Sequence, residues 1–133
     1  MKIVRQVLYL SILLFFSYTF LNKVLIYDSF LLNISKTGLF SSFQVYVLSV
    51  LAILLEALSI GLLLFKKRVG ILFSMGMMLV FTLYTVALYL LGRYEVCGCG
   101  GIMNGLSFES HLLVNLTLLL VMGYLLKEDV EEE

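Results

Sequence analysis

The sequence has no proline, no tryptophan, one histidine and only two cysteines. Without proline, no helix has to break or kink at that residue, which favours long uninterrupted helices. Without tryptophan, an aromatic belt at a membrane surface has to be built from the 8 tyrosines and 10 phenylalanines. The histidine and both cysteines fall within residues 97–111, so thiol or imidazole chemistry is confined to that stretch.

Charge is scarce as well. Only 14% of the residues are charged, the net charge is zero, 62% are hydrophobic, and the mean hydropathy is +1.07. Soluble domains are about one-quarter charged and about half apolar, so this composition is that of a membrane protein. No basic patch with interleaved aromatic residues is present, which argues against a nucleic acid as partner. The length of 133 residues allows a single domain, residues 1–133.

Four apolar runs are long enough to cross a bilayer, which requires about 20 helical residues. They predict an all-α four-helix transmembrane bundle with spans at about residues 6–27, 43–65, 69–91 and 109–126. The first run has the basic start of a signal peptide, but no small-residue cleavage site follows it. We therefore interpret it as a retained helix.

Two polar features lie next to the first span. Lys23 stands near its far end, from which a lysine can extend its ammonium to the membrane interface. Residues 28–42 are too polar to span but still carry several apolar side chains. They predict a short amphipathic segment on the membrane surface.

Basic residues are unevenly divided between the two ends of the predicted bundle. Six belong to the end with both termini: Lys2, Arg5, Lys66, Lys67, Arg68 and Lys127. Three belong to the other end: Lys23, Lys36 and Arg93. By the positive-inside rule both termini are cytoplasmic, and residues 28–42 and 92–108 face outward. The cysteines then lie on the oxidising side of the membrane, where a disulfide can persist.

Each predicted span carries a face of small or polar residues, which is typical of helix packing in membranes. These residues are Ser11, Tyr18 and Asn22; Ser49, Ala52, Glu56 and Ser59; Ser74, Thr82, Thr85 and Tyr89; and His111 and Asn115. Glu56 stands out, because an ionised carboxylate at mid-bilayer costs a few kcal/mol or more. It must be protonated or bound to a hydroxyl or amide, and we expect Tyr18, Asn22, Thr82 or Asn115. A structural hydrogen-bond hub and a role in binding a proton or ligand are both open.

The stretch after the third span contains the most chemistry. Cys97 and Cys99 are separated by Gly98 and followed by Gly100 and Gly101, and five of the ten glycines fall in residues 92–105. Glycine lets the backbone turn tightly and leaves amide N–H groups open to a bound anion or carbonyl.

The cysteine loop ends at a predicted helix. Ser107 stands where a helix N-cap is expected, and His111 and Asn115 follow at intervals of four, on one helix face.

Three interpretations of the loop remain open. A disulfide between Cys97 and Cys99 closes a very small ring, and departure from relaxed geometry makes such a bond easier to reduce. Cys97, Cys99 and His111 could instead be three ligands of an open zinc or copper site, or the disulfide could be an inert staple. His111 is either a proton carrier beside the thiols or an interfacial side chain bonded to a loop carbonyl.

Taken together, these residues resemble the MauE branch of the MauE/DoxX family, small four-helix membrane proteins associated with redox functions. The resemblance rests on Asn22-Lys23 through Phe30, Glu56 with Gly61, Phe81-Thr82-Leu83-Tyr84, Cys97-Gly98-Cys99-Gly100-Gly101, and Ser107, His111 and Asn115. It covers most of residues 10–125, and the loop with its histidine and asparagine is the specific part.

The resemblance implies disulfide chemistry outside the cytoplasm of a bacterium, at its inner membrane, with a thioredoxin-like partner. It also implies a bundle similar to the quinone-linked disulfide-forming proteins of the vitamin K epoxide reductase type, and hence a quinone as cofactor. On this basis Cys97, Cys99 and His111 are the expected catalytic residues. The expected cofactor-binding residues are Gly98, Gly100, Gly101, Ser107, Asn115 and Glu56. Alternatives are a non-catalytic membrane partner in the maturation of a periplasmic protein and a carrier of a small ligand or metal.

Overall fold

The computed structural model describes residues 2–36, 38–92 and 107–132. Within these ranges the chain is entirely helical, with α1 (Lys2–Leu25), α2 (Tyr27–Lys36), α3 (Ser42–Phe65), α4 (Lys67–Leu90) and α5 (Phe108–Glu132). All but α2 are long and apolar enough to cross a membrane. The predicted all-α class with four such helices is confirmed, whereas the arrangement of vitamin K epoxide reductase stays a prediction.

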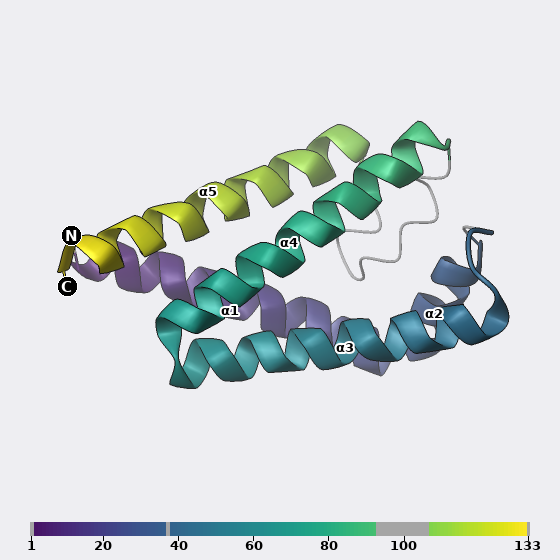
Figure 1. Cartoon of the computed structure of the whole chain (residues 1–133), viewed down its shortest axis with the longest axis horizontal. Helices are drawn as coiled ribbons and strands as arrows, with labels where there is room; N and C mark the ends of the chain where they lie inside the picture. The colour runs from purple at the N-terminus through teal and green to yellow at the C-terminus, as the bar shows by residue number, and fades with distance from the viewer. Residues whose placement is uncertain (1, 37, 93–106, 133) are drawn as a thin grey trace.

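The four long helices run back and forth between two ends of the molecule. Figure 1 shows both termini at one end, together with the turn between α3 and α4, while α2 and the start of α5 lie at the other. Helix α3 packs against α1, α2 and α4, and α5 packs against α1 and α4. Lys67 at the start of α4 contacts both α5 and α1 at this end. Its Nζ lies 3.5 Å from Asp129 Oδ1 and 5.3 Å from the centre of the Tyr9 ring.

Local signals explain where the helices begin and turn. Ser41 caps α3 with a reciprocal pair of bonds: Gln44 N–H donates to Ser41 Oγ, and Ser41 N–H donates to Gln44 Oε1. At the other end of α3, the single residue Lys66 separates it from α4. A Cβ at Gly70 would lie 2.5 Å from the Leu63 nitrogen, so only glycine allows the two helices to approach this closely.

The predicted amphipathic segment at residues 28–42 contains helix α2. Its Phe30 and Ile34 are buried and cluster with Val45 of α3. The amphipathic pattern is therefore satisfied by packing on α3, and the place of α2 at a membrane surface stays a prediction.

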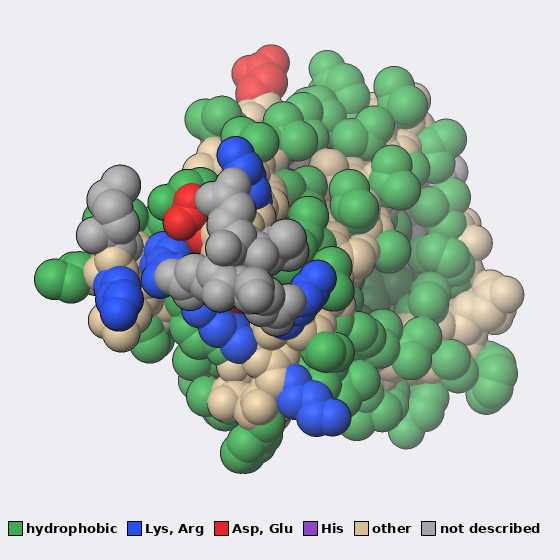
Figure 2. Space-filling view, turned by 60° about the vertical axis from the view of Figure 1, so that its left-hand side comes forward, with side chains coloured by type: hydrophobic (Ala, Val, Ile, Leu, Met, Phe, Trp, Pro, Cys, Tyr) green, Lys and Arg blue, Asp and Glu red, His purple; other side chains and the backbone are tan. Residues whose placement is uncertain are grey.

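The main hydrophobic core lies between α1, α3, α4 and α5. It consists of Ile12, Phe16, Leu63, Ile71, Met78, Met122 and Leu125. Outward-facing leucines on every long helix are largely exposed, for example Leu14, Leu54, Leu83 and Leu120 at 60–75%. Figure 2 shows this hydrophobic flank beside an end where Lys and Arg side chains gather. Lipid is the surrounding in which such a flank is stable.

A buried polar cluster as the candidate functional site

A buried ion pair joins α1 to α3. Lys23 Nζ lies 2.6 Å from Glu56 Oε1, and the two side chains are only 5% and 1% exposed. Thr19 Oγ1 is 3.4 Å from the same carboxylate oxygen and also donates to the Phe16 carbonyl at 3.1 Å. Among the described residues, the second oxygen, Glu56 Oε2, has no hydrogen-bond partner.

The sequence positions these groups through one face of α1. Ile12, Phe16, Thr19 and Lys23 are all buried, and their spacing of four, three and four residues puts them on one stripe. Ile12 and Phe16 belong to the hydrophobic core. Thr19 and Lys23 bring a hydroxyl and an ammonium to Glu56. The Lys23 ammonium also lies 5.7 Å and 5.5 Å from the ring centres of Phe30 and Phe81, within reach of cation–π attraction.

Two expectations for these residues were wrong. Lys23 does not extend to an interface, because α2 folds over the end of α1 and encloses its side chain. Glu56 binds none of the four expected partners. Thr82 donates to the Met78 carbonyl, Asn22 donates to the Tyr18 carbonyl, and Tyr18 is 41% exposed. A cation on a neighbouring helix compensates a buried carboxylate better than a neutral amide does.

His111 and Asn115 lie in the same region. Both are 2% exposed and, with Thr19, Lys23 and Glu56, line a cavity of about 20 Å³. Asn115 Nδ2 has no hydrogen-bond partner among the described residues. A water molecule needs about 10–15 Å³, so a cavity of this size has room for one.

The sequence leaves His111 either as a proton carrier beside the thiols or as an interfacial side chain, and its role stays a prediction. The residue is in the first turn of α5, where its backbone N–H donates to the Ser107 carbonyl at 2.9 Å, and its side chain is buried inside the bundle. Ser107 has the predicted capping role, since its Oγ accepts from the Ser110 N–H at 3.4 Å. Ser107 itself is exposed and does not line the cavity with His111 and Asn115.

Some of the polar residues that were predicted on the helix faces are buried, and others are exposed. The polar residues predicted for α3, α4 and α5 are mostly buried: Ser49, Glu56, Ser59, Ser74, Thr82, Thr85, His111 and Asn115. On α1, however, Ser11 and Tyr18 are exposed, and Thr19 and Lys23 occupy the interior instead. The polar face predicted for α1 did not include these two buried residues, although their spacing from Ile12 and Phe16 could have revealed them.

The segment with the two cysteines follows the C-terminal end of α4 and precedes the start of α5 in the sequence. Cys97, Gly98, Cys99, Gly100 and Gly101 lie outside the described residues, so their proposed roles stay predictions. At the two ends of the loop, Tyr89 and Phe108 stack with ring centres 4.0 Å apart. Among the described residues, no group of three His, Cys, Asp or Glu side chains is arranged to hold a metal ion.

The sequence was compared with known families, curated proteins and solved structures. Residues 1–127 match the family described as methylamine utilisation protein MauE. The chain belongs to the MauE family. No curated protein and no solved structure matches it. The resemblance to MauE is thus confirmed over nearly the whole chain, whereas the wider relationship to DoxX stays a prediction.

Proposed function

We propose that this MauE-family membrane protein is a thiol–disulfide oxidoreductase. It exchanges electrons between an extracytoplasmic thioredoxin-like partner and a membrane quinone through Cys97 and Cys99. The observation that supports this is the buried cluster of Lys23, Glu56 and His111, in a chain whose only two cysteines lie just before the helix of His111. Buried ionisable groups gathered inside a membrane bundle are typical of sites that handle protons. The family description adds methylamine utilisation as the setting.

The exchange balances as follows in the oxidising direction. One thiolate of the partner attacks the Cys97–Cys99 disulfide, and the second partner thiol resolves the mixed disulfide. The partner leaves with a new disulfide, and Cys97 and Cys99 become thiols. Two electrons and two protons then pass from this pair to the quinone, which becomes quinol, and the disulfide forms again. The same balance in reverse reduces the partner.

His111 is the proposed proton carrier in this exchange. It follows the loop by one helical turn and shares a cavity with Glu56 and Asn115. These groups can pass a proton between the loop side of the bundle and the carboxylate.

A second candidate is a non-catalytic membrane partner in the maturation of a periplasmic protein. The observation that favours it is the Lys23–Glu56 pair, because a buried ion pair can fix how helices pack without taking part in any reaction. A carrier of a small ligand or metal is a third candidate, favoured by the cavities beside this pair.

The proposed location is the bacterial inner membrane, with both termini cytoplasmic and the cysteine loop outside. The basic residues of the chain ends and of the Lys66–Arg68 turn support this orientation. We expect a membrane-impermeant thiol reagent to label Cys97 or Cys99 in intact, reduced cells. Labelling that requires broken cells would reverse the orientation and remove the oxidising compartment from the proposal.

The proposed function is tested first by the redox behaviour of the cysteine pair. Structural disulfides typically have potentials below about −300 mV. We expect Cys97 and Cys99 to switch between thiol and disulfide well above this value, because a C-x-C ring is small and departs from relaxed geometry. Mass spectrometry of alkylated protein across a glutathione titration measures the switch. A pair that stays oxidised under strongly reducing conditions is an inert staple, and the redox function is then wrong.

A further inference from the structure

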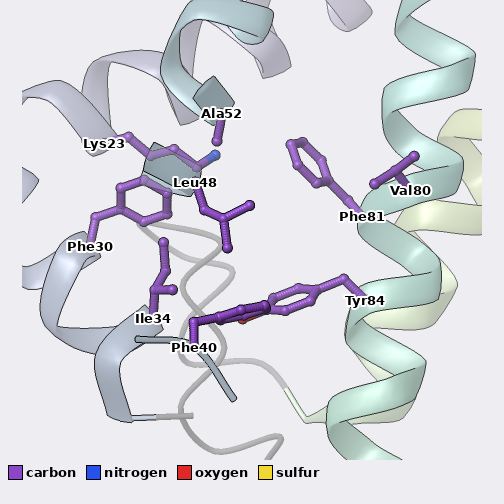
Figure 3. A pocket seen from close by; sticks show the side chains of 9 residues that line it. All are labelled: Lys23, Phe30, Ile34, Phe40, Leu48, Ala52, Val80, Phe81 and Tyr84. Atoms are coloured by element: carbon purple, nitrogen blue, oxygen red, sulfur yellow. The ribbon is translucent and has the colours of Figure 1, made fainter. Parts of the chain in front are cut away.

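A second cavity is also lined by Lys23. It measures about 190 Å³, between α1, α2, α3 and α4. Its walls are Lys23, Phe30, Ile34, Phe40, Leu48, Ala52, Val80, Phe81 and Tyr84. Figure 3 shows these side chains converging on a common space, with the Lys23 nitrogen between Phe30 and Ala52.

The chemistry of these walls is specific. Four of the nine lining residues carry aromatic rings, Phe30, Phe40, Phe81 and Tyr84, which favours a flat ring over a flexible chain. Lys23 is the only charged residue in the lining, and its side chain is 5% exposed. An ammonium has three N–H donors, and among the described residues Lys23 Nζ donates one side-chain hydrogen bond, to Glu56 Oε1 at 2.6 Å. Donors therefore remain for a ligand oxygen.

The cavity opens on the lipid-facing flank. Val80, which lines it, is 62% exposed. Val80 and Phe81 also line a neighbouring apolar groove of about 480 Å³, whose other walls are Leu55, Leu72, Phe73, Gly76 and Met77. A ligand can thus place a ring in the cavity and an apolar tail in the groove.

We propose that this cavity binds the ring of a membrane quinone, with Lys23 donating a hydrogen bond to a ring carbonyl and the isoprenoid tail lying in the groove. The choice of a quinone rests on the proposed function. A fatty acid offers the same oxygen and tail, but the four aromatic walls select the planar ring. Lys23 and Phe81 also line the smaller cavity of His111, so the bound ring adjoins the groups proposed to carry protons.

The ring site is tested with a matched pair of substitutions on α3. Ala52 lines the cavity, whereas Ala57 is exposed on the same helix. Full-length protein in lipid nanodiscs is photolabelled with an azidoquinone that carries a short isoprenoid tail. We expect Ala52→Phe to fill the cavity and weaken labelling at least about tenfold, a loss of about 1.4 kcal/mol. Ala57→Phe should leave labelling unchanged, and labelled peptides should come from the cavity walls.

The tail groove is tested with a second pair that does not depend on how Ala52→Phe folds. A Cβ added at Gly76 or Gly61 would meet no atom within 4 Å, so both positions have room for the first carbon of a larger side chain. Only Gly76 lines the groove. Gly76→Leu should weaken binding of the tailed quinone but not of a tail-less quinone, and Gly61→Leu should weaken neither.

The outcomes separate this inference from the proposed function. Equal labelling of the Ala52 and Ala57 variants, or displacement of the label by oleate but not by a tail-less quinone, overturns the quinone site. If the Ala52→Phe variant oxidises a dithiol with quinone at the wild-type rate, the quinone site is also overturned, while the redox function stands. The opposite outcome has two parts. Wild type and the Cys97→Ser/Cys99→Ser variant both bind the azidoquinone, and Ala52→Phe weakens this binding, but wild type oxidises no thiol. The quinone site then stands and the redox function fails.

Discussion

Lys23→Met is expected to lower the free energy of unfolding by about 3–5 kcal/mol, the usual cost of removing one partner of a buried ion pair. The loss follows from geometry, because Glu56 is 1% exposed and its Oε1 is only 2.6 Å from the ammonium. Without Lys23, the one other described donor near that carboxylate is the Thr19 hydroxyl, whose single hydrogen also has the Phe16 carbonyl within reach. Reversible unfolding in mixed micelles, titrated with an anionic detergent, measures the change.

Two further variants make this test specific. Lys36→Met removes an exposed lysine of α2 and should change the free energy of unfolding by no more than about 0.5 kcal/mol. The double variant Lys23→Met/Glu56→Met replaces both charges with apolar groups and should recover most of the stability, since such replacements are often neutral or stabilising. A single variant as mild as Lys36→Met, or a double variant no better than the single, would contradict the buried pair.

The double variant also separates packing from function. If it is stable but inactive in thiol exchange, the charges serve the reaction. If it is stable and active, Lys23 and Glu56 only hold α1 against α3, and thiol exchange does not need their charges.

The four long helices were predictable, because each apolar run is long enough to span and no proline interrupts it. The partner of Glu56 was not, since Lys23 is 33 residues away and its burial depends on how α2 folds over α1. A shift of one residue also matters on a helix, where neighbours point about 100° apart. The face predicted from Tyr18 and Asn22 therefore misses Thr19 and Lys23, which lie one position further along.

The aromatic cavity shows the same limit of sequence reasoning. Phe30 and Ile34 belong to the segment that the sequence predicts at a membrane surface, and the sequence does not reveal that they form walls of a space shared with α3 and α4. Such a space depends on contacts between four helices. Periodicity along one helix predicts which face is apolar. It does not reveal where packed apolar faces leave a cavity between them.

His111→Ala is expected to slow quinone-dependent dithiol oxidation by about 10²–10⁴-fold, the typical contribution of a general acid or base. His111 shares its cavity with Glu56 and Asn115 and lies one turn after the end of the cysteine loop. Because the side chain is 2% exposed, alanine also leaves a space in the bundle. Rates must therefore be normalised to the folded fraction, with Leu113→Ala on the exposed side of α5 as the control.

The variant that decides the role of His111 is His111→Gln. Glutamine fills much of the same space and keeps hydrogen-bonding ability, but it cannot take up a proton at neutral pH. We expect it to be nearly as slow as alanine while retaining near wild-type stability. Wild-type turnover with glutamine would make His111 a packing and hydrogen-bonding residue, and its proton role would be wrong. If neither variant alters turnover, or wild type oxidises no dithiol with any quinone, the maturation partner replaces the enzyme as the function of this chain.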